Sequence, residues 1–245
     1  MSRLFIDPSK LADDLVVIAG EDHRYLTRVL RLKIGDAVVL FDGMGVEADA
    51  TIARVGPRAL ELRVEARRPA PKAERPDVTL IQALTKGDKL DLVVQKATEL
   101  GVARIIPVTS ARSVPRLEAM RAIGRRTRWQ KIARDAARQS GRVDVPEIEP
   151  VTALSTALTS SPNDAFRVLL WEGARQSSLR TVIPTERPKR VVIVTGPEGG
   201  FSEEEVEFAR AAGFAVVGLG PRILRTETAA LVTLAILGFA LGDLG

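Results

Sequence analysis

Hydrophobic and polar positions follow two different patterns along the chain. Up to about residue 68, short apolar runs are separated by polar turns, and Glu47 to Val55 alternates polar and apolar residues as a half-exposed strand does. Asp42-Gly43-Met44-Gly45 between two runs predicts a hairpin turn. The expected elements are strands at Arg3 to Ile6, Leu15 to Ile18, Ala37 to Phe41, Val46 to Val55 and Ala59 to Ala66, with a helix from Asp22 to about Leu30. Such short strands predict a small β-barrel, a fold that often binds nucleic acid.

The segment from Arg67 to Asp77 contains three prolines, alternating charges and almost no apolar residue to bury. This composition is typical of a linker. We therefore predict a barrel domain at residues 1–70 and a second domain at residues 71–245.

Beyond the linker, apolar strands alternate with amphipathic helices. Strands are expected at Val78 to Ala83, Ile105 to Val108, Phe166 to Trp171, Val191 to Val194 and Phe214 to Leu219, and helices at Lys89 to Leu100, Glu118 to Ser140, Thr152 to Leu158, Glu203 to Ala212 and Thr228 to Leu241. The alternation predicts an α/β fold with a mainly parallel sheet covered by helices on both faces. Ligands of such sheets bind beyond the carboxyl ends of strands, which points to the loops after Trp171, Thr195 and Leu219.

One of these loops follows the most apolar strand, in the stretch VVIVTGPEGGFSEEE (191 to 205). Ser202 and Glu205 form a capping-box pattern, which predicts that a helix begins there. The glycines between strand and helix allow a ligand to approach the backbone. The spacing matches neither GxGxxG nor a P-loop, and Glu198 would repel phosphates. The residues alone leave open a ligand-binding corner and an ordinary tight turn.

The amino-acid composition excludes some kinds of site and some classes of protein. The chain is 45% hydrophobic and 27% charged, as ordinary globular proteins are, and has no cysteine and one histidine. Disulfides and thiolate metal sites are therefore excluded, and we expect no metal. The N-terminus lacks the apolar core of a signal peptide, and the longest apolar run, Ala229 to Leu241, is shorter than a bilayer requires. We expect a cytoplasmic protein without a membrane span.

The net charge of +5 is unevenly distributed. Between Arg112 and Arg142 there are ten Lys or Arg and two Asp or Glu, whereas the other 26 bases and 29 acids leave the rest of the chain slightly acidic. A local basic stripe rich in arginine is the footprint of a polyanion such as nucleic acid. The alternative is a solvated helix face.

Five ordered blocks resemble a known family: LTKGDKLDLVVQKATELGV (84 to 102), the turn at Arg112-Ser113-Val114, RWQKIARDAARQSGR (128 to 142), GPEGGFSEEE (196 to 205) and LGPRILRTETA (219 to 229). Together with HRYLTRVLRLKIGD (23 to 36) they resemble the small-subunit ribosomal RNA uracil-N3 methyltransferases of the SPOUT superfamily. Tyr25 is one position where relatives often carry another residue.

The resemblance implies a PUA-like barrel, a SPOUT α/β domain with a trefoil knot, and a homodimer with active sites at its interface. It also implies S-adenosyl-L-methionine (SAM) as the donor for methylation of N3 of a specific uridine in 16S, the small-subunit, ribosomal RNA. By position, the cofactor pocket would contain Leu170, Glu172, Gly196, Glu198, Gly200, Leu219, Ile223, Leu224, Thr226, Glu227, Thr228 and Ala229.

Methyl transfer to N3 needs an aligned acceptor, methyl carbon and sulfur, and a group that accepts the proton or stabilises the uracil anion. Arg225 offers a donor fork to O2 or O4 and is our first choice for that role. The alternative is a structural salt bridge from Arg225 to Glu227 or Glu198. Glu198 is a candidate proton acceptor, or else a carboxylate that holds loop amides.

Contacts to ribosomal RNA or to the ribosomal subunit are expected from basic residues of both domains. The candidates are His23, Arg24, Arg28, Arg31, Arg112, Arg125, Arg126, Arg128, Lys131, Arg134, Arg138 and Arg142. For the group around His23 the alternative is a plain surface helix. Trp129 fits packing as well as base stacking, and the terminal helix fits either the core or a dimer interface.

Two other functions remain open at this point. One is another SPOUT activity, such as ribose 2′-O methylation or tRNA methylation. The other is an RNA-binding or ribosome-assembly protein without catalysis.

Overall fold

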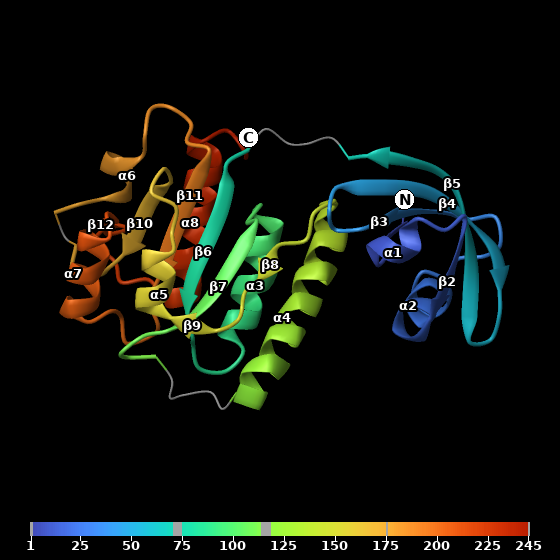
Figure 1. Cartoon of the computed structure of the whole chain (residues 1–245), viewed down its shortest axis with the longest axis horizontal. Helices are drawn as coiled ribbons and strands as arrows, with labels where there is room; N and C mark the ends of the chain where they lie inside the picture. The colour runs from blue at the N-terminus through green and yellow to red at the C-terminus, as the bar shows by residue number, and fades with distance from the viewer. Residues whose placement is uncertain (1, 71–74, 114–118, 175, 245) are drawn as a thin grey trace. The chain divides into compact units, whose positions relative to one another are not determined.

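The structure is a computed structural model that describes residues 2–70, 75–113, 119–174 and 176–244. By their internal contacts the residues form two compact units. The first contains residues 1–73 together with 137–145, and the second contains residues 74–136 and 146–245. The two units are described separately (Figure 1).

The first unit is built on a five-stranded sheet with the order β1-β3-β4-β5-β2. Its strands are β1 (Ser2–Phe5), β2 (Leu15–Ala19), β3 (Ala37–Phe41), β4 (Val46–Val55) and β5 (Ala59–Pro69). β1 pairs with β3 in parallel, and the other pairs are antiparallel. One apolar core, which includes Leu4, Leu40 and Leu62, fills the unit. The five strands predicted from polar and apolar alternation are all present.

The expected helix at Asp22 to Leu30 is present, although its geometry differs. An α-helix, α2 (Gly20–Arg24), continues into the π-helical turn η1 (Tyr25–Val29), which buries Leu26. Arg31 then adopts a left-handed backbone with φ of 55°, which ends the helical segment. The short helix α1 (Pro8–Leu11), begun by Pro8 after the capping Asp7, was not predicted.

The second unit contains a parallel sheet with the order β12-β10-β11-β6-β7-β8, and the short strand β9 pairs with β7. The strands are β6 (Asp77–Ala83), β7 (Arg104–Thr109), β8 (Glu147–Ile148), β9 (Thr152–Ala153), β10 (Phe166–Leu170), β11 (Arg190–Thr195) and β12 (Ala215–Val217). Each pairing is parallel, so the predicted parallel α/β sheet is confirmed. All carboxyl ends therefore meet at one edge.

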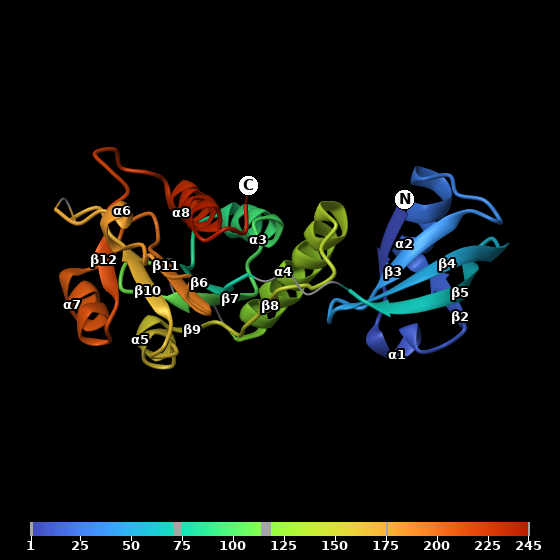
Figure 2. The same cartoon turned by 90° about the horizontal axis from the view of Figure 1, so that it is seen from above.

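Helices cover both faces of this sheet. The helices of the second unit are α3 (Lys89–Glu99), α5 (Leu154–Thr159), α6 (Leu179–Val182), α7 (Glu203–Ala211) and α8 (Thr226–Ala240). The helix α4 (Ala119–Ser140) belongs to this unit as far as Ala136, and its remaining residues belong to the first unit. Figure 2 shows α3 and α8 on one face, and α5 and α7 on the other. A core cluster that contains Ile81, Val194 and Phe201 lies between the sheet and α5 and α7.

Several expected boundaries need correction. The linker predicted at Arg67 to Asp77 is shorter, because Arg67 and Arg68 continue β5 as far as Pro69; residues 71–74 lie outside the described part. The helix predicted from Thr228 begins at Thr226. The helix predicted at Thr152 to Leu158 starts as strand β9. The short elements β8 and α6 were too brief to leave a periodic signal. Glu118, the predicted start of α4, is not described.

Candidate functional site

The loops after β10 and β11 meet at the glycine corner. Gly200 has φ of 69°, a left-handed conformation that suits glycine. A Cβ built on Gly200 would lie 2.3 Å from Glu172 Oε1, so the carboxylate of Glu172 packs directly against this glycine. The two loops that the sequence suggested for one pocket are therefore in direct contact.

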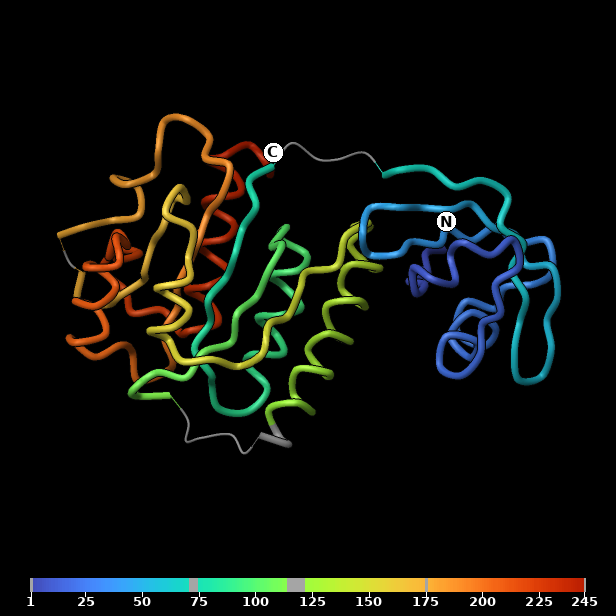
Figure 3. Tube along the Cα trace, viewed as in Figure 1, coloured from blue at the N-terminus to red at the C-terminus, as the bar shows by residue number. Residues whose placement is uncertain are grey.

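The loops after β10 and β12 are also joined. Gly218 N donates a hydrogen bond to Ser177 O at 2.8 Å, and Leu179 N donates to Gly218 O at 3.2 Å. A Cβ on Gly218 would lie 2.9 Å from Ala174 O. This contact fixes the backbone immediately before Leu219, the residue after which the third predicted loop begins. Figure 3 traces the path of the chain through these segments, coloured by residue number.

A buried polar network joins the glycine corner to α8. Thr226, the first residue of α8, donates through Oγ1 to Gly196 O. Gln82, near the end of β6, donates through Nε2 to Thr226 Oγ1 at 3.0 Å and accepts a hydrogen bond from Thr195 Oγ1 at 2.5 Å. With the two preceding contacts, the three predicted loops form one connected assembly at the carboxyl edge of the sheet.

Glu198 is anchored rather than free. Its Oε1 accepts hydrogen bonds from Lys89 Nζ at 2.7 Å and from Lys86 N at 3.1 Å. Desolvation opposes ionisation, but the hydrogen bond from Lys89, backbone hydrogen bonds at Glu198 and Lys86, and the Lys89 charge outweigh it and lower the pKa of Glu198. A carboxylate with a lowered pKa is a weaker base. These contacts match the loop-holding alternative for Glu198.

Arg225 makes neither of the salt bridges weighed as its alternative role. The residue is exposed just before α8, and its side chain forms no hydrogen bond or ion pair with another residue in the described part of the chain. Nearby, Glu227 Oε2 is buried and has no hydrogen-bond partner among the described residues. A buried carboxylate oxygen without a partner is costly, so this atom is suited to a ligand donor.

The remaining predicted pocket residues differ in exposure. Leu170 is buried at the end of β10, and Leu219, Leu224 and Ala229 are half-buried. Thr228 is exposed, and Ile223 is 85% exposed. Leu170, Leu219, Leu224 and Ala229 can therefore supply apolar walls, whereas the side chain of Ile223 is almost fully exposed to solvent.

Two protein-family profiles match this chain, one in each of its two parts. The profile of the RNA methyltransferase domain family matches residues 72–238, and that of the RNA methyltransferase PUA domain matches residues 18–65. Ribosomal RNA small subunit methyltransferase E of Bacillus subtilis is 34% identical over 98% of this chain and 96% of its own length. The chain belongs to the ribosomal RNA small subunit methyltransferase E family.

Solved structures of similar sequence agree with this family. A ribosomal RNA small subunit methyltransferase E from Neisseria gonorrhoeae, bound to S-adenosyl methionine, aligns with a TM-score of 0.87 and 32% identity, covering 98% of this chain and 97% of that one. A putative methyltransferase from Legionella pneumophila with bound SAM aligns with a TM-score of 0.87 and 30% identity over 97% of each chain. The predicted family and the PUA-like first domain are confirmed.

In the second unit, several residues that were predicted to contact RNA already bind other residues of the protein. Arg112 Nη1 donates to Gly199 O at 3.1 Å, so this turn packs on the glycine corner. Arg126 Nε donates to Ile148 O at 2.7 Å, and Arg128 pairs with Asp88 and Asp91. Lys131 and Arg134 are exposed, and Arg125 is half-buried. Part of the basic stripe therefore holds the fold together.

In the first unit, the residues predicted to contact RNA differ in their exposure and in their partners within the protein. The guanidinium of Arg138 lies 4.3 Å from the centre of the Tyr25 ring, and Arg142, whose side chain is 8% exposed, pairs with Asp144 at 2.7 Å. His23 is buried, with Nε2 at 3.0 Å from Gly56 O. The unusual Tyr25 thus has an arginine partner. Arg24, Arg28 and Arg31 are exposed and stay candidates.

Trp129, which the sequence left between two roles, is a packing residue. Its side chain is 2% exposed, and Nε1 donates to Asp91 Oδ1 at 2.9 Å. Sequence reasoning missed Gln82 and Lys89 as parts of the site. The available signal for Gln82 was an uncharged polar residue directly after the apolar pair Leu80 and Ile81, near the end of a strand.

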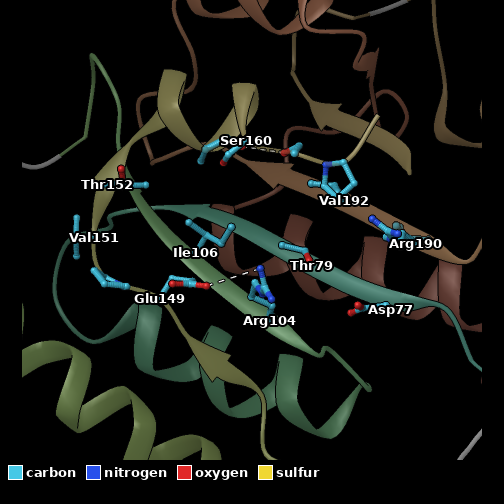
Figure 4. A pocket seen from close by; sticks show the side chains of 15 residues that line it. Asp77, Thr79, Arg104, Ile106, Glu149, Val151, Thr152, Ser160, Arg190 and Val192 are labelled. Atoms are coloured by element: carbon cyan, nitrogen blue, oxygen red, sulfur yellow. Dashed lines mark hydrogen bonds and ion pairs between the residues drawn. The ribbon is translucent and has the colours of Figure 1, made fainter. Parts of the chain in front are cut away.

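A groove lies at the opposite edge of the sheet. It has a volume of about 590 Å³ and is lined at the starts of β6, β7 and β11 by residues such as Thr79, Arg104 and Val192. Figure 4 shows Arg104 paired with Glu149 across it. Cofactors of parallel sheets bind at carboxyl ends, so this groove is not the cofactor site. Within the described ranges, no helix could cross a bilayer and no cluster of side chains could hold a metal.

Proposed function

We propose that this protein uses SAM to methylate N3 of a specific uridine in small-subunit ribosomal RNA, in the cytoplasm. The observation that carries the proposal is the assembly of three loops, joined through Gly200, Gly218 and Thr226, in a member of this family. Such an assembly brings backbone from three separate segments to one point at the carboxyl edge of the sheet.

The residues present suit SAM. The glycine corner lies at the carboxyl end of β11, with its Cβ positions filled by Phe201, Arg112 and Glu172, and apolar surface comes from the partly or fully buried Leu170, Leu219 and Leu224. The orphaned oxygen of Glu227 can accept a hydrogen bond from a ligand hydroxyl or amine. When bound, SAM supplies an electrophilic methyl group and its own leaving group, so the protein's part is orientation and electrostatics.

Arg225 is proposed to orient the uracil and to stabilise the negative charge that develops when N3 loses its proton. Its exposed side chain without a protein partner is consistent with this role, because a guanidinium already engaged by Glu198 or Glu227 could not reach a base. Glu198 remains the candidate proton acceptor from the sequence, but its bonds to Lys89 and Lys86 favour the anchoring alternative.

A homodimer is proposed as the active form, with a second copy covering the outer face of α3 and α8. These helices pack on each other, and Leu92, Ile236 and Phe239 on them are 42%, 41% and 75% exposed. Exposed large apolar side chains on two helices that pack together are the basis for proposing an interaction surface there. The trefoil knot stays a prediction from the family resemblance.

The deciding experiment is methylation of small ribosomal subunits and of free RNA with labelled SAM, followed by mass spectrometry of the nucleosides. We expect 3-methyluridine. A 2′-O-methyl nucleoside, or a product in tRNA alone, would overturn the N3 assignment in favour of another methylation. No product from either substrate would favour an RNA-binding role.

A further inference from the structure

Gln82 occupies a position in the second unit where every polar atom of its side chain is used. The residue is 0% exposed and is the last but one of β6. Nε2 lies 3.1 Å from Ala83 O, 3.0 Å from Thr226 Oγ1 and 3.5 Å from Gly196 O, and Oε1 accepts from Thr195 Oγ1. One amide therefore contacts the end of β11, the glycine corner and the start of α8.

The hydrogen-bond directions fix how this amide is oriented. A threonine hydroxyl has one proton, and that of Thr226 is donated to Gly196 O, so Thr226 Oγ1 can only accept from Gln82. The hydroxyl of Thr195 donates to the other end of the amide. The position thus requires an uncharged group that donates on one side and accepts on the other.

We propose that Gln82 is a positioning residue of the methyl-transfer site, which sets the place of the glycine corner relative to the first turn of α8. Gly196 lies within the corner, and Thr226 lies between Arg225 and Glu227, so both ends of the network adjoin proposed site residues. The inference rests on the proposed function. A displacement of either segment would misalign the cofactor and the base without removing a group that touches them.

Two substitutions test the inference: Gln82→Leu removes the hydrogen bonds of the amide, and Gln82→Glu makes them depend on pH. Leucine removes every hydrogen bond of the Gln82 amide at similar volume and leaves the hydroxyls of Thr195 and Thr226 without their amide partner. We expect its KM for SAM to rise about tenfold or more and its kcat to fall, while RNA binding is unchanged. Thr98→Val is the matched control, because Thr98 is equally buried and its hydroxyl donates to Val94 O at 2.7 Å, within α3.

Gln82→Glu gives a readout that a merely structural role would not produce. Burial raises the pKa of a glutamate, and the protonated acid still offers one donor for Thr226 Oγ1 and one acceptor for the Thr195 hydroxyl, whereas the ionised form has no donor. The activity of this variant relative to the wild type should therefore approach one near about pH 6 and fall about tenfold by about pH 8.5. A ratio that is constant over this range in a folded variant would overturn the proposal.

Thr195 provides an independent test should the Gln82 variants fail to fold. Thr195→Ser keeps the hydroxyl that donates to Gln82, whereas Thr195→Val removes it at nearly the same volume. We expect the serine variant to keep the wild-type KM for SAM and the valine variant to raise it several-fold. Equal KM values in both variants would overturn the inference. A wild-type enzyme that forms no 3-methyluridine would instead sink the proposed function.

Discussion

Lys89 Nζ and Glu198 Oε1 lie 2.7 Å apart and join the start of α3 to the glycine corner after β11. Both side chains are partly exposed, at 34% and 28%. The pair therefore lies in a partly solvated setting, where a single ion pair contributes little free energy. Its main effect is geometric, since Glu198 also holds Lys86 N and so ties two loops together.

Glu198→Gln separates anchoring from proton transfer. If Glu198 anchors the corner, the amide keeps an acceptor oxygen, and SAM affinity falls only about two- to fivefold, with kcat nearly unchanged. Loss of a general base would instead lower kcat by about 10² to 10⁴. Calorimetry for SAM and single-turnover kinetics for methyl transfer distinguish the two outcomes, and a large loss of kcat with intact affinity would contradict anchoring.

The lowered pKa of Glu198 also predicts a pH dependence of stability. Because the folded-state pKa lies below the ordinary value of 4.5, the stabilisation from ionised Glu198 is present above about 4.5 and is lost as pH falls through the folded pKa. The difference in urea midpoint between wild type and Glu198→Gln should therefore be constant near neutral pH and shrink in acid. A difference that grows on acidification would be evidence against this ion pair.

Arg225→Ala should retain SAM binding and lose most methyl transfer, by about 10² to 10³ in rate, as expected when a donor to developing charge is removed. Arg222→Ala is the matched control, because Arg222 is an exposed arginine in the same loop. We expect Arg222→Ala to stay close to the wild type. Undiminished turnover of Arg225→Ala in a filter assay with labelled SAM would refute the assigned role.

The sequence predicted the elements of the site better than its internal contacts. The glycine corner and its capping box were recognisable because Ser202 and Glu205 are local signals, and the structure contains both hydrogen bonds of that box. Gln82 and Thr226 are 144 residues apart in sequence, so no periodicity could indicate their hydrogen bond. Long-range contacts of this kind depend on strand order, which the alternation of strands and helices leaves undetermined.

Contacts between distant residues were also not predictable for the basic stripe from Arg112 to Arg142. Charge density alone treated Arg125, Arg128 and Arg142 alike, yet Arg128 pairs with aspartates and Arg142 is nearly buried beside Asp144. An arginine's partner is set by tertiary packing, because its long side chain reaches several elements. Local net charge therefore predicts a basic surface but not which arginines remain available for phosphate.

Arg28 in the first unit is exposed and makes no ion pair with another residue in the described ranges, which makes it a direct test of RNA binding. Replacing Arg28 with Ala should weaken RNA binding and reduce the slope of log K against log salt by about 0.7 to 0.9. Arg210→Ala removes the same charge from α7, where Arg210 pairs with Glu207. We expect an unchanged slope for that control, measured by fluorescence anisotropy in a salt series. An unaltered slope for Arg28→Ala would exclude a phosphate contact there.

Phe239 tests the proposed dimer. It is 75% exposed on α8, although burial of a phenylalanine contributes about 1.5 to 3 kcal/mol. A twofold interface uses each such residue twice, so Phe239→Asp should weaken dimerisation by at least about a hundredfold and give monomers in sedimentation velocity at micromolar concentration. Phe208→Asp, at a 44% exposed position on α7, should leave the wild-type dimer intact. If Phe239→Asp stays dimeric while Phe208→Asp dissociates, the interface lies on α7 instead, and active sites formed at α8 between two copies would be ruled out.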